Sequence, residues 1–219
     1  MALLVRIVQW RLRKLRDNKR HLERKLKEHE ALLVRATRDA LTDLWNRTAI
    51  LEILERAIDE ARKTSTPLAV ALIDVDHFKH INDTYGHLGG DAVLRALGSL
   101  LSTKVRTTDS LGRYGGEELL LVMPGLAMER PSPLVERLRE AIEEMPVTYQ
   151  DSTICVAASI GVAWLDPCAD VAESLLNRSD AALYAAKDGG RNCVHYAYSY
   201  TETQRMRRGS IDPKIRQVV

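Results

Sequence analysis

Cysteine is scarce in this sequence of 219 residues. The three cysteines (Cys155, Cys168 and Cys193) form no CxxC pair, which excludes a disulfide framework and a cysteine-ligated zinc site and predicts a reducing, cytoplasmic location. No run of eighteen apolar residues is present, so no membrane-spanning helix is predicted. The apolar opening MALLVRIVQW is interrupted by Arg6 and has no small-residue cleavage site, which argues against a signal peptide.

Net charge is also low, at +2, but it is unevenly distributed. Residues 1–38 contain twelve lysines and arginines against four acidic residues, whereas the rest of the chain contains 20 basic and 26 acidic residues. A basic segment followed by an acidic body indicates two modules. We expect a helical segment over 1–40, a folded domain over 41–199 and a flexible tail over 200–219.

The first module has a heptad pattern without glycine or proline. Nine of the eleven positions of its seam are apolar: Val5, Val8, Leu12, Leu15, Lys19, Leu22, Leu26, His29, Leu33, Ala36 and Ala40. This pattern predicts a parallel coiled coil that makes the protein a homodimer. A single helix packed on its own domain, or a basic face against anionic lipid, are the alternatives, while the lack of interleaved aromatic residues disfavours nucleic acid. The stretch WRLRKLR is typical of the cytoplasmic edge of a membrane helix, which suggests a soluble part of a longer, membrane-anchored receptor.

In the second module, helical and strand-like stretches alternate. Helices are predicted over 48–64, 77–87, 89–105, 132–145 and 170–190, with Asp91 opening the third. Strands are predicted over 67–76, 152–165 and 192–197, with a hairpin near 113–125. This alternation, with one hairpin, indicates an α/β sandwich with a mixed sheet.

The segment RYGGEELLLVMPG places two acidic residues beside a tight turn. Gly115 and Gly116 are expected to form a two-residue hairpin loop with positive φ. Glu117 and Glu118 would then lie next to Asp74, at the exposed end of the strand LAVALIDVD, if the two strands pair. Three carboxylates from adjacent strands suit Mg²⁺, which prefers oxygen ligands and shares them with phosphate. Taken separately, DVD could be a helix cap and GGEE a plain turn.

Five segments together resemble the GGDEF family of diguanylate cyclases. They are DALTDLWNR, LIDVDHFKHINDTYGHLGGD, RYGGEEL, SIGVA and DAALYAAKDGGRN, in this order. The resemblance covers about residues 39–197 and implies a central five-stranded sheet flanked by helices, related to adenylyl cyclase and polymerase palm domains. It also implies condensation of two GTP molecules into cyclic di-GMP with release of two pyrophosphates. The family usually has phenylalanine where this chain has Leu119, which we expect to point into the core.

The resemblance implies roles for particular residues. The implied metal ligands, for two Mg²⁺ or Mn²⁺ ions, are Asp74, the carbonyl of Val75, Glu117 and Glu118. The implied catalytic residues are Glu117, Glu118 (as a proton acceptor or further ligand) and Lys79. The implied GTP-binding residues are Asn82 and Asp91 at guanine, His87 near ribose and base, Phe78 and Lys79 at the triphosphate, and Lys187 and Arg191 at its outer phosphates. A carboxylate can accept from both guanine N1–H and N2–H₂, which favours Asp91 as a guanine ligand; a helix cap at Asp91 and core packing of Phe78 are the alternatives.

A further arginine motif precedes the hairpin. Arg106 and Asp109 match the RxxD of the family's inhibitory product site, and Arg137 matches a position that supplies a second arm. Arginine suits phosphate and the Hoogsteen edge of guanine, although surface charges at a helix end would look the same. The alternatives to a cyclase are a receptor that binds GTP or cyclic di-GMP without turnover, a cyclase with mixed purine products, and a coiled-coil scaffold for anionic partners.

Overall fold

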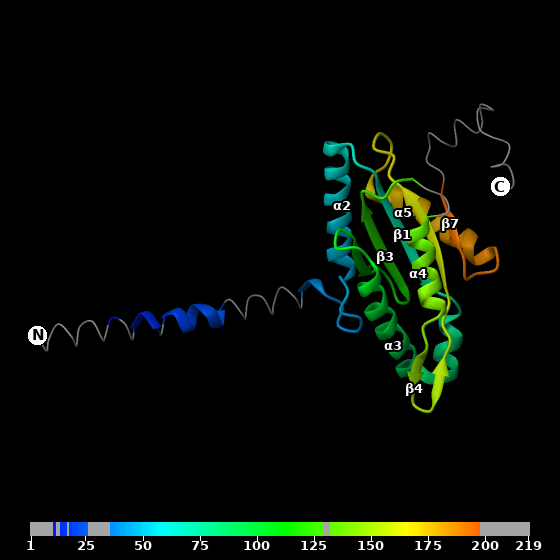
Figure 1. Cartoon of the computed structure of the whole chain (residues 1–219), viewed down its shortest axis with the longest axis horizontal. Helices are drawn as coiled ribbons and strands as arrows, with labels where there is room; N and C mark the ends of the chain where they lie inside the picture. The colour runs from blue at the N-terminus through cyan, green and yellow to red at the C-terminus, as the bar shows by residue number, and fades with distance from the viewer. Residues whose placement is uncertain (1–10, 12–13, 17, 26–35, 129–131, 198–219) are drawn as a thin grey trace, which may run out of the picture. The chain divides into compact units, whose positions relative to one another are not determined.

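The computed structural model describes residues 11, 14–16, 18–25, 36–128 and 132–197, and the chain divides into two units, Met1–Arg38 and Asp39–Val219 (Figure 1). In the first unit the described residues up to 25 are helical and exposed, including the seam residues Leu15 (65% exposed) and Leu22 (70%). The seam residue Lys19 is also described and exposed, whereas the other predicted seam positions before residue 36 and the predicted tail lie outside the described residues. No helix among the described residues is long and apolar enough to span a membrane.

The second unit is built on a five-stranded sheet with the order β2-β3-β1-β6-β7. The strands are β1 (Leu68–Val75), β2 (Ser110–Arg113), β3 (Glu118–Pro124), β6 (Ala158–Trp164) and β7 (Val194–Tyr196). The central strand β1 is antiparallel to β3 and to β6, while β7 is parallel to β6. The predicted five-stranded mixed sheet is therefore confirmed.

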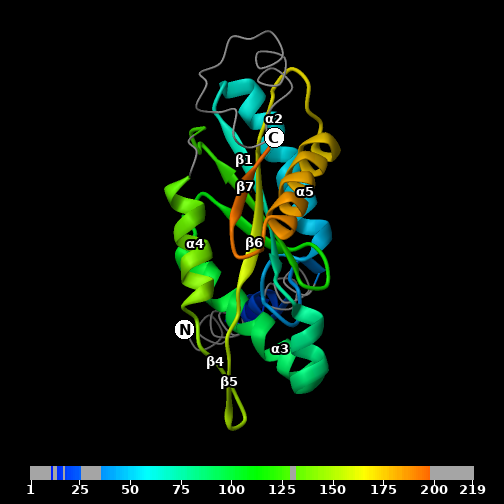
Figure 2. The same cartoon turned by 90° about the vertical axis from the view of Figure 1, so that its right-hand side faces the viewer.

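Helices cover both faces of this sheet. Four helices do so: α2 (Arg47–Thr64), α3 (Phe78–Lys104), α4 (Pro133–Glu143) and α5 (Ala172–Asp188). Alternate residues of β1 enter two separate cores, one shared with α3 and α4 and the other with α2 and α5. Figure 2 shows α4 and α5 on opposite sides of the sheet. All eight residues of β1 are buried, as expected for a central strand covered on both faces.

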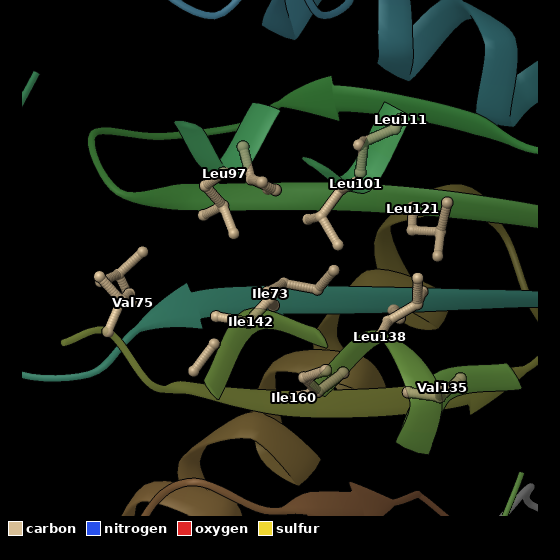
Figure 3. Packing of buried hydrophobic residues seen from close by; sticks show 14 of the residues in the cluster. Ile73, Val75, Leu97, Leu101, Leu111, Leu121, Val135, Leu138, Ile142 and Ile160 are labelled. Carbon is tan, nitrogen blue, oxygen red and sulfur yellow. The ribbon is translucent and has the colours of Figure 1, made fainter. Parts of the chain in front are cut away.

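Figure 3 shows the core beneath α3 and α4. Side chains of both helices pack on Ile73 of β1 and Ile160 of β6. Leu119 belongs to this core and is 1% exposed, so the prediction that it points inward is confirmed. Another apolar side chain at this position changes packing and not chemistry.

Helix α5 lies unusually close to β6 at Gly161. A Cβ atom there would lie 2.2 Å from the backbone nitrogen of Leu183 and 2.2 Å from the carbonyl oxygen of Ser179, so only glycine fits. The Ser179 hydroxyl donates to the Gly161 carbonyl at 2.7 Å and closes the contact. This packing fixes the direction of α5, whose last turn carries Lys187.

Two predicted boundaries were wrong. The helix break lies at Gly86 (φ 73°, ψ 168°), so Asp91 is inside a helix and does not open it. The predicted strand 152–165 is two strands, β5 (Ser152–Ile154) and β6, because β5 pairs with β4 (Val147–Tyr149) in a separate hairpin. A continuous apolar and β-branched run does not reveal such a break.

Candidate active site

The site begins where the end of β1 lies beside the start of β3. Asp74 pairs with Glu118 in the antiparallel register, which confirms the predicted neighbourhood. Asp74 is 6% exposed, so the expectation of an exposed carboxylate was wrong. Burial raises the pKa of Asp74, although the Lys187 ammonium, whose Nζ lies 2.8 Å from Asp74 Oδ2, opposes this shift. The charged form of a buried carboxylate of this kind is stabilised by any cation placed beside it.

In the turn between β2 and β3, the two glycines have a different role from the one predicted from the sequence. Neither Gly115 nor Gly116 has positive φ, so the two-residue loop was a wrong prediction. The amides of Tyr114 and Gly115 both donate to the Glu118 carbonyl, at 2.9 and 3.1 Å. A Cβ atom on Gly115 would lie 2.4 Å from Glu118 Oε2. Glycine is thus required at position 115 because any side chain there would clash with the Glu118 carboxylate.

The carboxylates around this turn suit a hard divalent cation. Burial, followed by the charge of Asp74, raises the pKa of Glu118, and Glu117 adds to the effect. Among the described residues no group of three or more His, Cys, Asp and Glu is already arranged to hold a metal. Mg²⁺ is commonly bound by one or two carboxylates together with substrate phosphates and not by an all-protein cage. The oxygen-only donors therefore fit Mg²⁺ that arrives with a phosphate-bearing substrate.

A cleft of about 450 Å³ extends from this turn along the start of α3. It joins Glu117 to residues predicted to bind nucleotide, and its lining is Phe78, Lys79, Asn82, Asp83, His87, Asp91, Leu94, Arg113, Gly116 and Glu117. Phe78 is 9% exposed and belongs to the core, so the packing interpretation of Phe78 is confirmed, while its place at the triphosphate stays a prediction.

One glycine shapes the floor of this cleft. A Cβ atom on Gly90 would lie 2.0 Å from Asn82 Oδ1 and 3.0 Å from the Phe78 ring. The Asn82 amide therefore occupies space that a side chain at residue 90 would take. Asp91, the residue after Gly90, is half-buried and has the Arg95 guanidinium 3.7 Å from its carboxylate.

Lys187 and Arg191 lie outside the lining of the cleft. Lys187 contacts Asp74 as described above and is half-buried. Arg191 is exposed, and its backbone is in the left-handed region with φ 66°. The structure thus brings Lys187 to the carboxylates but places Arg191 just beyond the end of α5.

The three residues of the predicted inhibitory site also lie outside the cleft. The Arg106 guanidinium is 2.7 Å from Asp109 Oδ1 and also donates to the Pro124 carbonyl. The hydrogen bonds from Arg106 close a turn immediately before β2, and the Asp109 side chain is fully buried. Arg137 is exposed and lines a separate hollow of about 330 Å³ with Thr103, Lys104 and residues of α4.

The sequence analysis missed two residues that organise the turn between β2 and β3. Arg113 donates to the Gly116 carbonyl at 3.0 and 2.8 Å and is 3.2 Å from Asp39 Oδ2. Asp39 also accepts from the amide and hydroxyl of Thr42. The first residues of the second unit are therefore tied to the turn that carries Glu117. The only available signal was the presence of these residues inside the quoted motifs DALTDLWNR and RYGGEEL.

Comparison with known proteins identifies the family and the fold. The family described as "Diguanylate cyclase, GGDEF domain" matches residues 36–193. The chain belongs to the GGDEF family. The quoted carboxylates and the α3 cleft all fall inside the matched range.

Relatives and solved structures agree with this assignment. The chain is 36% identical over 163 residues to diguanylate cyclase DgcP of Pseudomonas aeruginosa, covering 74% of this chain and 24% of DgcP. It is 40% identical over 157 residues to diguanylate cyclase DosC of Escherichia coli K12, covering 71% of this chain and 34% of DosC. The chain thus spans less than half the length of these two relatives.

A crystal structure of the coiled coil and GGDEF domain of DgcB from Caulobacter crescentus, in complex with c-di-GMP, superposes with a TM-score of 0.77. Its sequence is 34% identical, and the match covers 84% of this chain and 97% of that one.

Proposed function

We propose that this protein is a diguanylate cyclase that condenses two GTP molecules into cyclic di-GMP and releases two pyrophosphates. The observation that carries the proposal is the single cleft that links Asn82 and Asp91 to Glu117, beside the Asp74–Glu118 pair. Membership of the GGDEF family supports the reaction. The intact carboxylates favour turnover over a receptor that only binds nucleotide.

In the proposed complex guanine lies towards Asn82 and Asp91. The Asp91 carboxylate accepts from N1–H and N2–H₂ of guanine, whereas adenine presents an acceptor at N1 and leaves the carboxylate poorly satisfied. His87 lies near the ribose and base. Lys79, Lys187 and Arg191 offset the charge of the triphosphate, and this requires Lys187 to share its ammonium between Asp74 and a phosphate.

Asp74, the Val75 carbonyl, Glu117 and Glu118 would hold two Mg²⁺ ions, for which Mn²⁺ could substitute. When bound, these ions neutralise phosphate charge and lower the pKa of the attacking hydroxyl. The 3′-hydroxyl of one GTP attacks the α-phosphorus of the other, the bond to the bridging oxygen breaks, and pyrophosphate leaves. Glu118 would act either as a further ligand of these ions or as the acceptor of the hydroxyl proton.

One domain holds one GTP, so ring closure needs two domains that face each other. The predicted coiled coil over 1–40 raises the local concentration of the second domain. Product binding at Arg106, Asp109 and Arg137 would give feedback inhibition. In its natural context we propose that the chain is connected to an upstream membrane sensor and works at the cytoplasmic side.

The deciding experiment incubates the protein with GTP and Mg²⁺ and identifies the product by mass. We expect cyclic di-GMP and two equivalents of pyrophosphate per product. A parallel incubation with GTP and ATP should give no mixed product. GTP binding without any product would favour the receptor. Binding of vesicles or nucleic acid, without GTP binding and without product, would favour the scaffold.

A further inference from the structure

Asn192, the residue after Arg191, is held by three residues from two other parts of the fold. Its backbone amide donates to Asp76 Oδ2 at 2.9 Å. Its side-chain carbonyl accepts from Arg139 Nη1 at 2.9 Å, and its side-chain amide donates to Glu143 Oε1 at 2.8 Å. Asparagine is suited to this position because it offers one acceptor to a cation and one donor to a carboxylate.

The partners of Asn192 are themselves fixed. Asp76 is 7% exposed and accepts from the Ser159 hydroxyl at 2.7 Å, which joins β6 to the end of β1. Arg139 and Glu143 lie one turn apart on α4 and are joined to each other at 2.7 Å. Hydrogen bonds from Arg139 and Asn192 lower the pKa of Glu143, so this carboxylate is charged at neutral pH. Asn192 is thus anchored on the sheet on one side and on α4 on the other.

This anchorage constrains the backbone on which Arg191 stands. Arg191 (φ 66°) and Asn192 (φ 46°) are consecutive residues in the left-handed region. The left-handed region is unfavourable for arginine and tolerated by asparagine. The Arg191 amide donates to the Ala186 carbonyl at 3.0 Å and ends α5, but the exposed Arg191 side chain has none of the contacts that hold Asn192.

We propose that Asn192 is a positioning residue that holds Arg191 at the outer phosphates of GTP. The inference rests on the proposed function of Arg191. Asn192 touches neither substrate nor metal in this scheme; it acts by fixing the backbone that precedes it. Through Arg139 and Glu143 it also attaches the phosphate-binding end of the site to α4.

The test compares binding of two nucleotides that differ in their phosphates. One is a GTP analogue with a methylene group between the α- and β-phosphates, which cannot be turned over, and the other is GMP. We expect Asn192→Ala to weaken the analogue by about tenfold, because a charged contact is misplaced, and to leave GMP binding unchanged. Asn192→Gly, which retains the backbone amide and accepts the left-handed φ, should recover part of the loss.

A double-mutant cycle separates positioning from general damage. Once Arg191→Ala has removed the guanidinium, Asn192→Ala should cost nothing further in analogue affinity. The control Asn177→Ala changes an exposed asparagine of α5 and should leave both affinities and the melting temperature unchanged. Equal losses for the analogue and GMP, additive losses in the cycle, or unchanged analogue binding in Asn192→Ala would each overturn the proposal. If Arg191→Ala alone leaves the affinity for the analogue unchanged, then Arg191 does not bind the outer phosphates and the positioning role of Asn192 is overturned as well. Production of cyclic di-GMP by the unaltered protein tests the proposed function separately.

Discussion

Asp74 of β1 and Glu118 of β3 are register partners, so their carboxylates leave the sheet at the same point. Glu117, the residue before Glu118, lines the cleft along α3. Burial, with a smaller contribution from the neighbouring carboxylates, raises the pKa values of Asp74 and Glu118, and the Lys187 ammonium opposes both shifts. The pairing of two strands therefore creates the demand for cations that the proposed chemistry uses.

Replacing Glu117 by glutamine should reduce cyclic di-GMP synthesis by at least about a hundredfold, because one negative ligand is lost. The melting temperature should change little, since Glu117 is only half-buried. Steady-state turnover with Mg²⁺ measures the loss. Glu60→Gln, on the exposed part of α2, is the matched control. Wild-type turnover in Glu117→Gln would show that the metal site has been placed wrongly.

Gly90→Ala should raise the KM for GTP, because the new methyl group would overlap the Asn82 amide. We expect on the order of a tenfold rise, comparable to loss of a specific polar contact. In an Asn82→Ala background, Gly90→Ala should raise the KM for GTP much less, since most of the overlap is gone. Initial rates at varied GTP concentration test both variants. Equal effects in the two backgrounds would mean that Gly90 acts on the helix and not on Asn82.

Arg106→Ala should weaken inhibition by cyclic di-GMP by about tenfold or more, because a charged guanidinium ligand for phosphate is removed. Turnover measured before product accumulates should be retained. The melting temperature is expected to fall as well, since the buried Asp109 carboxylate loses its partner. Arg137→Ala, which leaves Asp109 paired, separates the two effects. Inhibition unchanged in both variants would reduce the RxxD motif to a structural turn.

The link between Asp39 and Arg113 should appear as a pH-dependent stability. Burial alone would raise the pKa of Asp39, but hydrogen bonds from Thr42 and the charge of Arg113 outweigh burial and lower it. A carboxylate with a lowered pKa stabilises the folded state above its unfolded pKa of about 4, and this contribution is lost as the pH falls through the folded pKa. Asp39→Asn should therefore lower the melting temperature at pH 7, and the difference should narrow towards pH 3. A difference that stays constant with pH would exclude the charge as its source.

The sequence predicted the sheet, its helices and the meeting of Asp74 with Glu118, because buried strands and short quoted motifs carry those signals. It could not predict the path of the chain between motifs. The kink fell at Gly86 instead of before Asp91, since left-handed φ at one glycine leaves no periodic signal. The reason for Gly115 was likewise hidden, because it depends on where the Glu118 side chain folds back. The clamp on Asn192 joins residues 49 and 116 positions apart, so no local pattern contains it.

The heptad segment predicts that activity depends on dimerisation. Leu15 and Leu22 are 65% and 70% exposed in the single chain, and burying each in a coiled coil would contribute about 2–3 kcal/mol. Replacing both by lysine adds like charges to a seam that already carries Lys19. We expect the double variant to be monomeric at micromolar concentration in sedimentation experiments, and its turnover per mole to rise steeply with protein concentration. GTP binding to each chain should persist, because the cleft lies within one domain. His21→Lys, which adds a charge off the seam, should remain dimeric and fully active. A double variant that is monomeric yet fully active at nanomolar concentration would show that catalysis does not depend on the heptad segment. The two facing domains would then have to associate through another surface.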